Sequence, residues 1–137
     1  MSNTEFNVQD TTDIIVSNTI NMTTSPTRII SIYKGDTGSF DLAINLGTIV
    51  EPNIYELQDF DIVNFYVMYP NSDLDSSIIY KEYTKDDLNE DKSITIKLEG
   101  EDTQYLNEGV YYYTIKLYKA NGEVLTLQKR TKFIIMN

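Results

Sequence analysis

The sequence predicts an all-β protein, an antiparallel β-sandwich of about seven strands preceded by a polar N-terminal arm. Three observations carry this prediction. Several short segments alternate strictly between apolar and polar residues. Clusters of Gly, Pro, Asn, Asp and Ser separate these segments. No segment longer than a turn or two repeats its apolar residues with a helical period. The 137 residues suffice for one domain with its own core, which we place at residues 28–137, with the arm at 1–27.

The arm is a stretch rich in Asn, Thr and Ser that is interrupted only by Ile14, Ile15 and Val16. Two interpretations remain open: a flexible leader, or an arm that becomes ordered against a partner. In the second, the three apolar residues form the anchor. We therefore count Ile14, Ile15 and Val16 as candidate partner-binding residues, and expect residues 1–27 to lack strands in the isolated protein.

Alternating segments then predict the first five strands of the sandwich. They span residues 28–33, 40–46, 62–69, 78–83 and 94–98. The turn at 34–39 contains two glycines, and a long connection covers 47–61. In the third strand one face carries valine and phenylalanine, and the other carries Ile62, Asn64, Tyr66 and Met68. The short charged segment 85–92 and the corner 99–106 are each compatible with one helical turn.

The segment from residue 101 to 124 indicates which kind of sandwich this is. Tyr111 lies just inside the sixth strand, after Gly109, where its hydroxyl can reach the backbone of the turn at 101–106. This arrangement is the tyrosine corner of immunoglobulin-like sandwiches. The strand then places Tyr111, Tyr113, Ile115 and Leu117 toward the core, and Tyr112, Thr114, Lys116 and Tyr118 outward. The sequence therefore predicts an immunoglobulin-like fold.

Asn121-Gly122 marks the hairpin between the sixth strand and the last strand, 123–136. A two-residue turn would bring two leucines of the last strand to the outer face. A three-residue loop with Gly122 at its bulge pairs Lys119 with Glu123 instead, and keeps Leu125 and Leu127 on the core side. Burying a leucine contributes about 1.5–3 kcal/mol, so we predict the bulged loop, with Leu125 opposite Leu117 and Leu127 opposite Ile115.

Composition excludes several classes of function. The chain has no cysteine and no histidine, which removes disulfides, reactive thiolates, the commonest general base and the commonest zinc ligand. A net charge of −10 disfavours nucleic acid and anionic membranes as partners. No apolar run approaches the roughly 20 residues of a membrane span. The first ten residues show no features of a signal peptide, so we expect synthesis in the cytoplasm.

Three segments bear a partial likeness to ligand-binding motifs. Asn71, Asp73, Asp75 and Glu82 have the spacing of a calcium loop, but Ser76 occupies the position that requires glycine. The turn at 34–39 lacks the Gly-Lys-Ser/Thr of a phosphate-binding loop. The acidic residues at 86–91 lie in a short, charged turn. We therefore expect no catalytic residue, no metal, no cofactor and no small-molecule substrate.

The outward tyrosines are the remaining candidates for a binding function. Tyrosine on neighbouring strands can fill a protein interface or stack on a sugar, although scattered surface tyrosines also occur without any function. We favour the interface, and name Tyr66, Met68, Tyr112 and Tyr118 as candidate partner-binding residues on the outer face.

Three phrases together resemble a known family. They are IYKGDTGSFDLAI at 32–44, YELQDFDIVNFYVMYP at 55–70 and EDTQYLNEGVYYYTIKLYKANGEV at 101–124. They are similar to the immunoglobulin-like N-terminal domain of the phage baseplate upper protein family, from phages of Gram-positive bacteria. The resemblance covers about residues 29–137, rests on structural turns and implies no catalytic or binding residue.

The resemblance implies a non-enzymatic virion protein, a tail or baseplate assembly module that is made in the host cytoplasm and then assembled. Its partners would be other virion proteins, in many symmetric copies. A capsid decoration or neck-collar protein is the first alternative. A carbohydrate-binding host adhesin is an alternative of another class.

Overall fold

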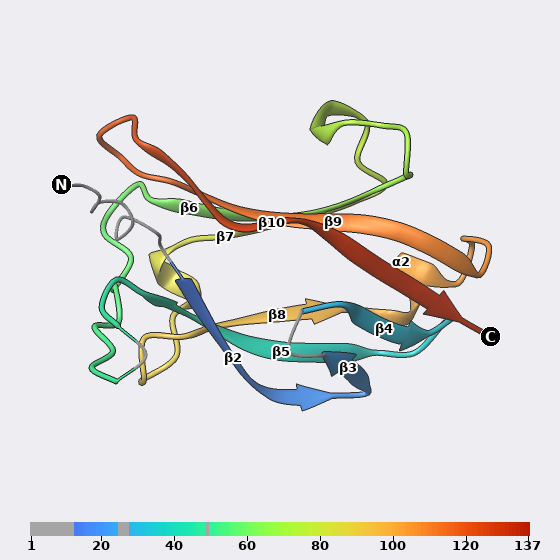
Figure 1. Ribbon diagram of the computed structural model, residues 1–137, viewed down its shortest axis with the longest axis horizontal. Coiled ribbons are helices and arrows are strands. Elements are labelled where there is room, and N and C mark those ends of the chain that lie inside the picture. The colour runs from blue at the N-terminus through green and yellow to red at the C-terminus, as the bar shows by residue number, and fades with distance from the viewer. Residues whose placement is uncertain (1–12, 25–27, 49) are drawn as a thin grey trace, which may run out of the picture.

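The computed structural model describes residues 13–24, 28–48 and 50–137. Within these ranges nine strands form two sheets that lie face to face (Figure 1). The six-stranded sheet has the order β3 (Met22–Thr24), β4 (Ile30–Tyr33), β10 (Val124–Met136), β9 (Gly109–Tyr118), β6 (Ile62–Met68) and β7 (Ile79–Tyr83). The three-stranded sheet has the order β2 (Asp13–Ile20), β5 (Gly38–Asn45) and β8 (Ile94–Leu98). The predicted all-β sandwich is confirmed, with nine strands rather than about seven.

Both extra strands come from the segment predicted as an arm. β2 pairs antiparallel with β5, which sets Ile14 opposite Ile44, and β3 pairs antiparallel with β4. The expectation that residues 1–27 lack strands is therefore wrong for residues 13–24. The physical reason is that Ile14 and Val16 point inward while the backbone of β2 completes a ladder with β5. Residues 1–12 and 25–27 of the predicted arm lie outside the described residues.

Short helical turns occupy the places where one turn of helix was predicted. They are η3 (Lys85–Asp87) and α2 (Gly100–Thr103); a third, η2 (Leu74–Ser76), lies in the connection between β6 and β7. Thr84 caps η3. Its side chain accepts a hydrogen bond from the Asp86 amide, and the Asp87 side chain accepts one from the Thr84 amide. This capping box accounts for a helical start in so short and charged a segment.

The strands are divided between the two sheets of a β-sandwich. β2, β5 and β8 form one sheet, β10, β9, β6 and β7 form the larger part of the other beside β4 and β3, and the α2 corner precedes β9. The predicted tyrosine corner is present, because the Tyr111 hydroxyl donates a 2.5 Å hydrogen bond to the backbone carbonyl of Asn107. The acceptor lies one residue beyond the predicted range 101–106, so the turn extends slightly further than its sequence suggested.

The hairpin between β9 and β10 has the predicted bulged loop. The Lys119 amide donates to the Glu123 carbonyl at 2.8 Å, and Leu125 lies opposite Leu117. The next predicted pair is wrong, because Ile115 lies opposite Gln128 and not opposite Leu127. Leu127 is nevertheless buried, since it occupies a register shift, which is where a β-bulge re-aims a side chain.

A second register shift in β10 follows between Gln128 and Thr131. Two shifts together restore the original alternation, and Phe133 returns to the core opposite Tyr111. Bulges also bend a strand, and β10 runs from beside β9 down toward β4 (Figure 1). There it pairs parallel with β4, with Phe133 opposite Ile30.

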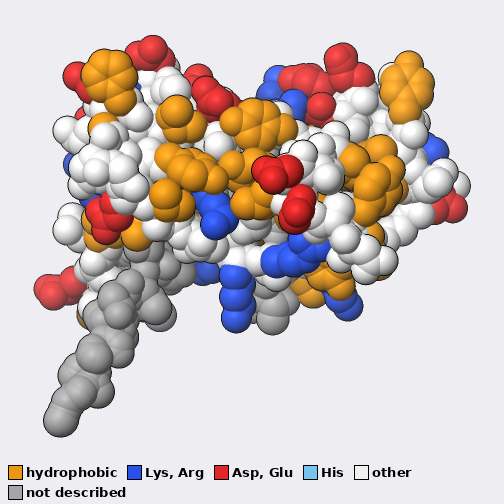
Figure 2. Space-filling model, turned by 90° about the horizontal axis from the view of Figure 1, so that it is seen from above, with side chains coloured by type: hydrophobic (Ala, Val, Ile, Leu, Met, Phe, Trp, Pro, Cys, Tyr) orange, Lys and Arg blue, Asp and Glu red, His pale blue; other side chains and the backbone are white. Residues whose placement is uncertain are grey.

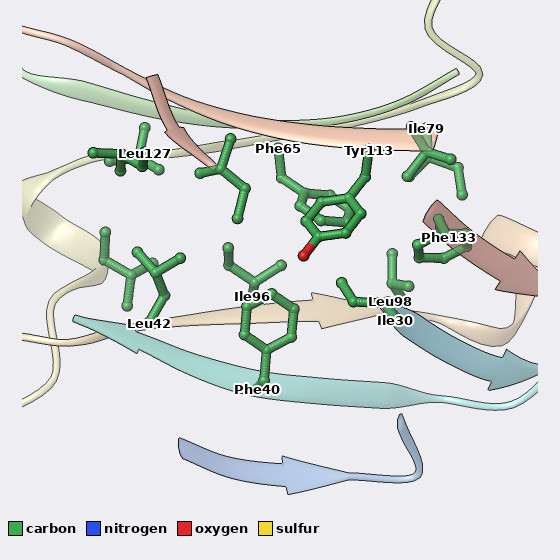
Figure 3. Packing of buried hydrophobic residues seen from close by; sticks show 14 of the residues in the cluster. Ile30, Phe40, Leu42, Phe65, Ile79, Ile96, Leu98, Tyr113, Leu127 and Phe133 are labelled. Atoms are coloured by element: carbon green, nitrogen blue, oxygen red, sulfur yellow. The ribbon is translucent and has the colours of Figure 1, made fainter. Parts of the chain in front are cut away.

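Aromatic side chains fill the centre of the core in place of a disulfide. Phe65 of β6 contacts three rings: Phe40 at a centroid distance of 6.4 Å, Tyr113 at 5.6 Å and Phe133 at 6.4 Å. Tyr113 extends from its sheet into the space between the layers (Figure 3), and its hydroxyl donates to the backbone carbonyl of Arg28. The polar end of this buried tyrosine is therefore satisfied, as burial requires.

Candidate functional site

The outer face of the six-stranded sheet carries a connected cluster of polar aromatic side chains. Neighbouring strands β6 and β9 bring the hydroxyls of Tyr66 and Tyr118 to 3.0 Å from each other. The Asn64 side-chain amide donates to the Tyr66 hydroxyl at 2.9 Å. Tyr66 and Asn64 are both almost fully buried. These contacts fix the side chains in one arrangement before any partner arrives, which lowers the entropy cost of binding.

Tyr80 extends this cluster to the edge strand β7. Its ring lies 5.4 Å from the Tyr66 ring, and its hydroxyl is 2.9 Å from Glu82 Oε1 and 3.2 Å from Asn64 Oδ1. Burial and the hydrogen bond to Glu82 raise the pKa of Tyr80 to about 12. Burial and the hydrogen bond with Tyr66 likewise raise the pKa of Tyr118 to about 12. Both phenols are therefore protonated at neutral pH and act as hydrogen-bonding groups.

Arg130 fastens the β6–β7 connection onto this outer face. Its Nη1 donates to the carbonyl of Ser72 at 3.0 Å, and its Nη2 donates to the carbonyls of Tyr69 at 3.1 Å and Pro70 at 2.7 Å. The guanidinium also lies 5.0 Å from the centroid of the Tyr112 ring, a cation–π contact. One side chain thus holds the β6–β7 connection against the sheet, although most residues of that connection are at least partly exposed.

A groove of about 330 Å³ opens between this connection and the sheet. We call it the outer-face groove, and it is lined by Met68, Ser72, Asp73, Leu74, Thr114, Lys116, Thr126, Lys129 and Arg130. The lining contains three basic residues and one acidic residue, in a protein whose net charge is −10. Figure 2 looks onto this side of the molecule, where hydrophobic side chains gather in the middle among charged groups.

The structure divides the four candidate residues of the outer face into two pairs. All four point outward from the sheet, as the alternation predicts. Tyr112 and Tyr118 are half-buried and available in part. Tyr66 is 8% exposed and Met68 is 1% exposed, so Met68 offers almost no surface to a partner. The reason is the Arg130 guanidinium, whose Nη1 lies 3.3 Å from the Met68 sulfur.

The three candidate residues of the N-terminal segment do not join the tyrosines. Ile14 is 2% exposed and belongs to the core, so it offers almost no surface to a partner. Val16 packs against the same core and is only partly buried. Ile15 is 38% exposed on the outer face of the three-stranded sheet, opposite Ala43. The predicted anchor is thus split between two faces of one strand.

Sequence reasoning missed several members of this surface. Tyr80 and Glu82 belong to it because β7 pairs with β6, and their even positions share the parity of Tyr66. That signal was available once β7 was recognised. Arg130 gave no such signal, because the two register shifts in β10 decide which way it points. The outer-face groove depends on how the β6–β7 connection folds back, which no periodicity encodes.

The chemistry offered by this surface is that of binding: protonated phenols, fixed amides, basic side chains and a mostly apolar groove. Among the described residues, no three Asp or Glu side chains come together in a way that would hold a metal ion. In the same part of the chain no helix is both long and apolar enough to span a membrane.

The sequence matches no protein-family model. A search of curated proteins likewise finds no match to it.

Proposed function

We propose that this chain is a non-enzymatic structural protein of a bacteriophage virion, a tail or baseplate assembly module that acts through protein–protein contacts. The observation that supports this proposal is the outer face of the six-stranded sheet. There a mostly apolar groove adjoins a pre-positioned tyrosine cluster, and Lys116, Lys129 and Arg130 border it. Such a mixture of apolar, aromatic and arginine side chains is typical of protein interfaces.

The resemblance of three segments to phage baseplate upper proteins supplies the setting of this proposal. A virion module needs a stable scaffold and a surface that recognises neighbours. The aromatic core around Phe65 provides the first, and the outer face provides the second. The partners are then other virion proteins in many symmetric copies, and the protein is located in the assembled particle.

The test uses purified particles of the phage that encodes the chain. Lysines are acetylated in the free protein and in intact particles, and the extent of modification is measured by mass spectrometry. We expect Lys116, Lys129 and Lys132 to be protected in particles, because they lie on or beside the outer-face groove. Lys97, on β8 of the opposite sheet, is the matched control and is about half exposed.

Absence of the protein from particles, or equal modification of the outer-face lysines in both states, would contradict the proposal. The position of its density in a particle map separates the baseplate from the capsid or neck. Binding of the isolated domain to host cell-wall polysaccharide would favour the adhesin. The structure gives that alternative no specific support, because the lining of the outer-face groove includes no aromatic ring.

A further inference from the structure

Phe60 is the most exposed phenylalanine in the described part of the chain, at 87% of its surface. It lies in the connection between β5 and β6, with a backbone φ of 71°. A bulky residue rarely adopts a positive φ, because its Cβ approaches the backbone. The chain thus holds a large apolar side chain in water and in a strained conformation at once.

The buried carboxylate of Asp61 maintains this conformation. Asp61 is 1% exposed, and its Oδ2 accepts from the Tyr55 hydroxyl at 2.5 Å and from the Gln58 amide at 2.9 Å. Its Oδ1 accepts from the Ala120 amide at 2.9 Å. The side chain after Phe60 is therefore anchored on three sides, and Phe60 itself is turned outward. Backbone strain that the surroundings maintain in this way clusters at ligand clamps and other functional sites.

The outer-face groove has the size and lining to accept such a side chain. Its volume is about 330 Å³, whereas a cavity of about 150 Å³ is enough to bind benzene. Leu74 contributes an apolar side chain, and the stems of Lys116 and Lys129 add more apolar groups. Insertion of a phenyl ring there would remove apolar surface of both the ring and the groove from water. This burial of apolar surface is the dominant favourable term in most protein associations.

The charges around Phe60 and around the groove are complementary. Asp59 precedes Phe60, and segments 50–61 and 85–92 together carry seven acidic residues besides the buried Asp61, against two basic residues. Ion pairs between Lys85 and Asp59 and between Lys92 and Glu56 hold these two segments side by side. The groove carries the opposite sign, with three basic residues against Asp73. Opposite potentials set both the orientation and the encounter rate of a complex.

We propose that Phe60 of one copy inserts into the outer-face groove of a second copy. This inference rests on the proposed function and names one of its partners as the chain itself. Phe60 and the groove occupy different surfaces, so the contact is heterologous and every copy offers both halves. Repetition of such a contact generates a ring or a filament. With a net charge of −10 per copy, an acidic end meeting a basic face is the arrangement that limits repulsion.

The experiment measures association of the wild-type chain by sedimentation velocity from about 1 μM to about 1 mM, the range of weak specific complexes. The wild type should associate, and added salt should weaken association. Phe60→Ala should weaken it roughly tenfold or more, the equivalent of losing one buried aromatic side chain. Tyr105→Ala is the matched control, because Tyr105 is also an exposed aromatic residue, at 85% of its surface. This variant should associate like the wild type.

Two more variants make the test specific to this contact. Thr126→Trp fills the groove from the exposed face of β10 and should also prevent association. Mixed with Phe60→Ala, it should form a complex of one copy of each, because one variant retains Phe60 and the other retains the groove. Phe60→Gly should raise the thermal midpoint, since glycine tolerates a positive φ, and should still fail to associate.

A wild type that stays monomeric throughout, Phe60→Ala associating like the wild type, or no complex in the mixture would each overturn the inference. None of these outcomes touches the proposed function, because protection of Lys116 and Lys129 in particles would then be due to a different virion protein. Conversely, the purified chain could associate as proposed and yet be absent from particles. That result would support the contact between copies and refute the virion assignment.

Discussion

Ile14 and Ile15 are neighbours in the chain, yet they lie on opposite sides of β2. Ile14 faces the core opposite Ile44 and is 2% exposed, whereas Ile15 faces water opposite Ala43 and is 38% exposed. Composition predicted that this segment belongs to a flexible arm, but β2 is one of the strands of the sandwich. This contrast within one dipeptide gives a direct test of the role of β2.

Ile14→Ala should destabilise the protein by about 2–5 kcal/mol, because it removes buried methyl groups and leaves a cavity in the core. Ile15→Ala, the matched control, should change the free energy of unfolding by less than about 0.5 kcal/mol. Urea denaturation of both variants measures the difference. Equal, small effects would mean that residues 13–20 do not belong to the folded domain in solution.

Tyr111→Phe should cost about 1 kcal/mol, the net value of one hydrogen bond to a backbone carbonyl. The lost bond is the one from the Tyr111 hydroxyl to the Asn107 carbonyl, and the ring itself can stay in place. Tyr105→Phe provides the comparison, since Tyr105 is 85% exposed and its hydroxyl is replaced by water contacts at no cost. Thermal unfolding of the two variants should separate them by several degrees.

Asp61 should make stability depend on pH in the acidic range. Burial raises the pKa of this carboxyl, but hydrogen bonds from Tyr55, Gln58 and Ala120 outweigh burial and lower the pKa below its ordinary value. A lowered pKa in the folded state stabilises the fold at pH values above the unfolded pKa of about 4. We expect that contribution to disappear as the pH falls from about 5 through the folded pKa.

Asp61→Asn should remove this pH dependence and cost about 1–3 kcal/mol at pH 7, because the amide nitrogen meets a backbone N–H that needs an acceptor. Asp59→Asn, at the exposed neighbouring carboxylate, should retain the wild-type profile. Unfolding free energies measured between about pH 3 and pH 7 provide the comparison. A profile unchanged by Asp61→Asn would show that other groups dominate acid unfolding.

Arg130→Lys should release the β6–β7 connection although it conserves the charge. A single ammonium group cannot reproduce the planar fork that reaches the carbonyls of Tyr69, Pro70 and Ser72. Amide hydrogen exchange should accelerate in residues 69–77, with a loss of global stability of about 1 kcal/mol. Lys132→Ala is the control on the same strand, and faster exchange in both variants alike would contradict the clamp.

Most strands could be predicted because their side chains alternate without interruption, as in 109–118. β2 was not predicted because half of its residues are polar and it lies in a segment rich in Asn, Thr and Ser, although the inward spacing of Ile14 and Val16 was a signal of period two. Alternation also gave the correct face for Tyr66 and Met68, but not their burial. The burial of Met68 depends on Arg130. The direction of the Arg130 side chain follows from two register shifts in β10, which no pattern in the sequence predicts. The positive φ of Phe60 is equally invisible in the sequence, since it results from the bonds of Asp61.

The parallel pairing of β4 with β10 joins Ile30 to Phe133, about a hundred residues later in the chain. A ribosome adding about 5–20 residues per second needs several seconds to travel from one to the other. Throughout that interval the inner edge of β4 has no ladder partner, and such an edge pairs readily with strands of other nascent chains. Production of many copies at once is therefore most prone to aggregation before β10 emerges, so slower translation or lower temperature during expression should raise the yield of folded protein.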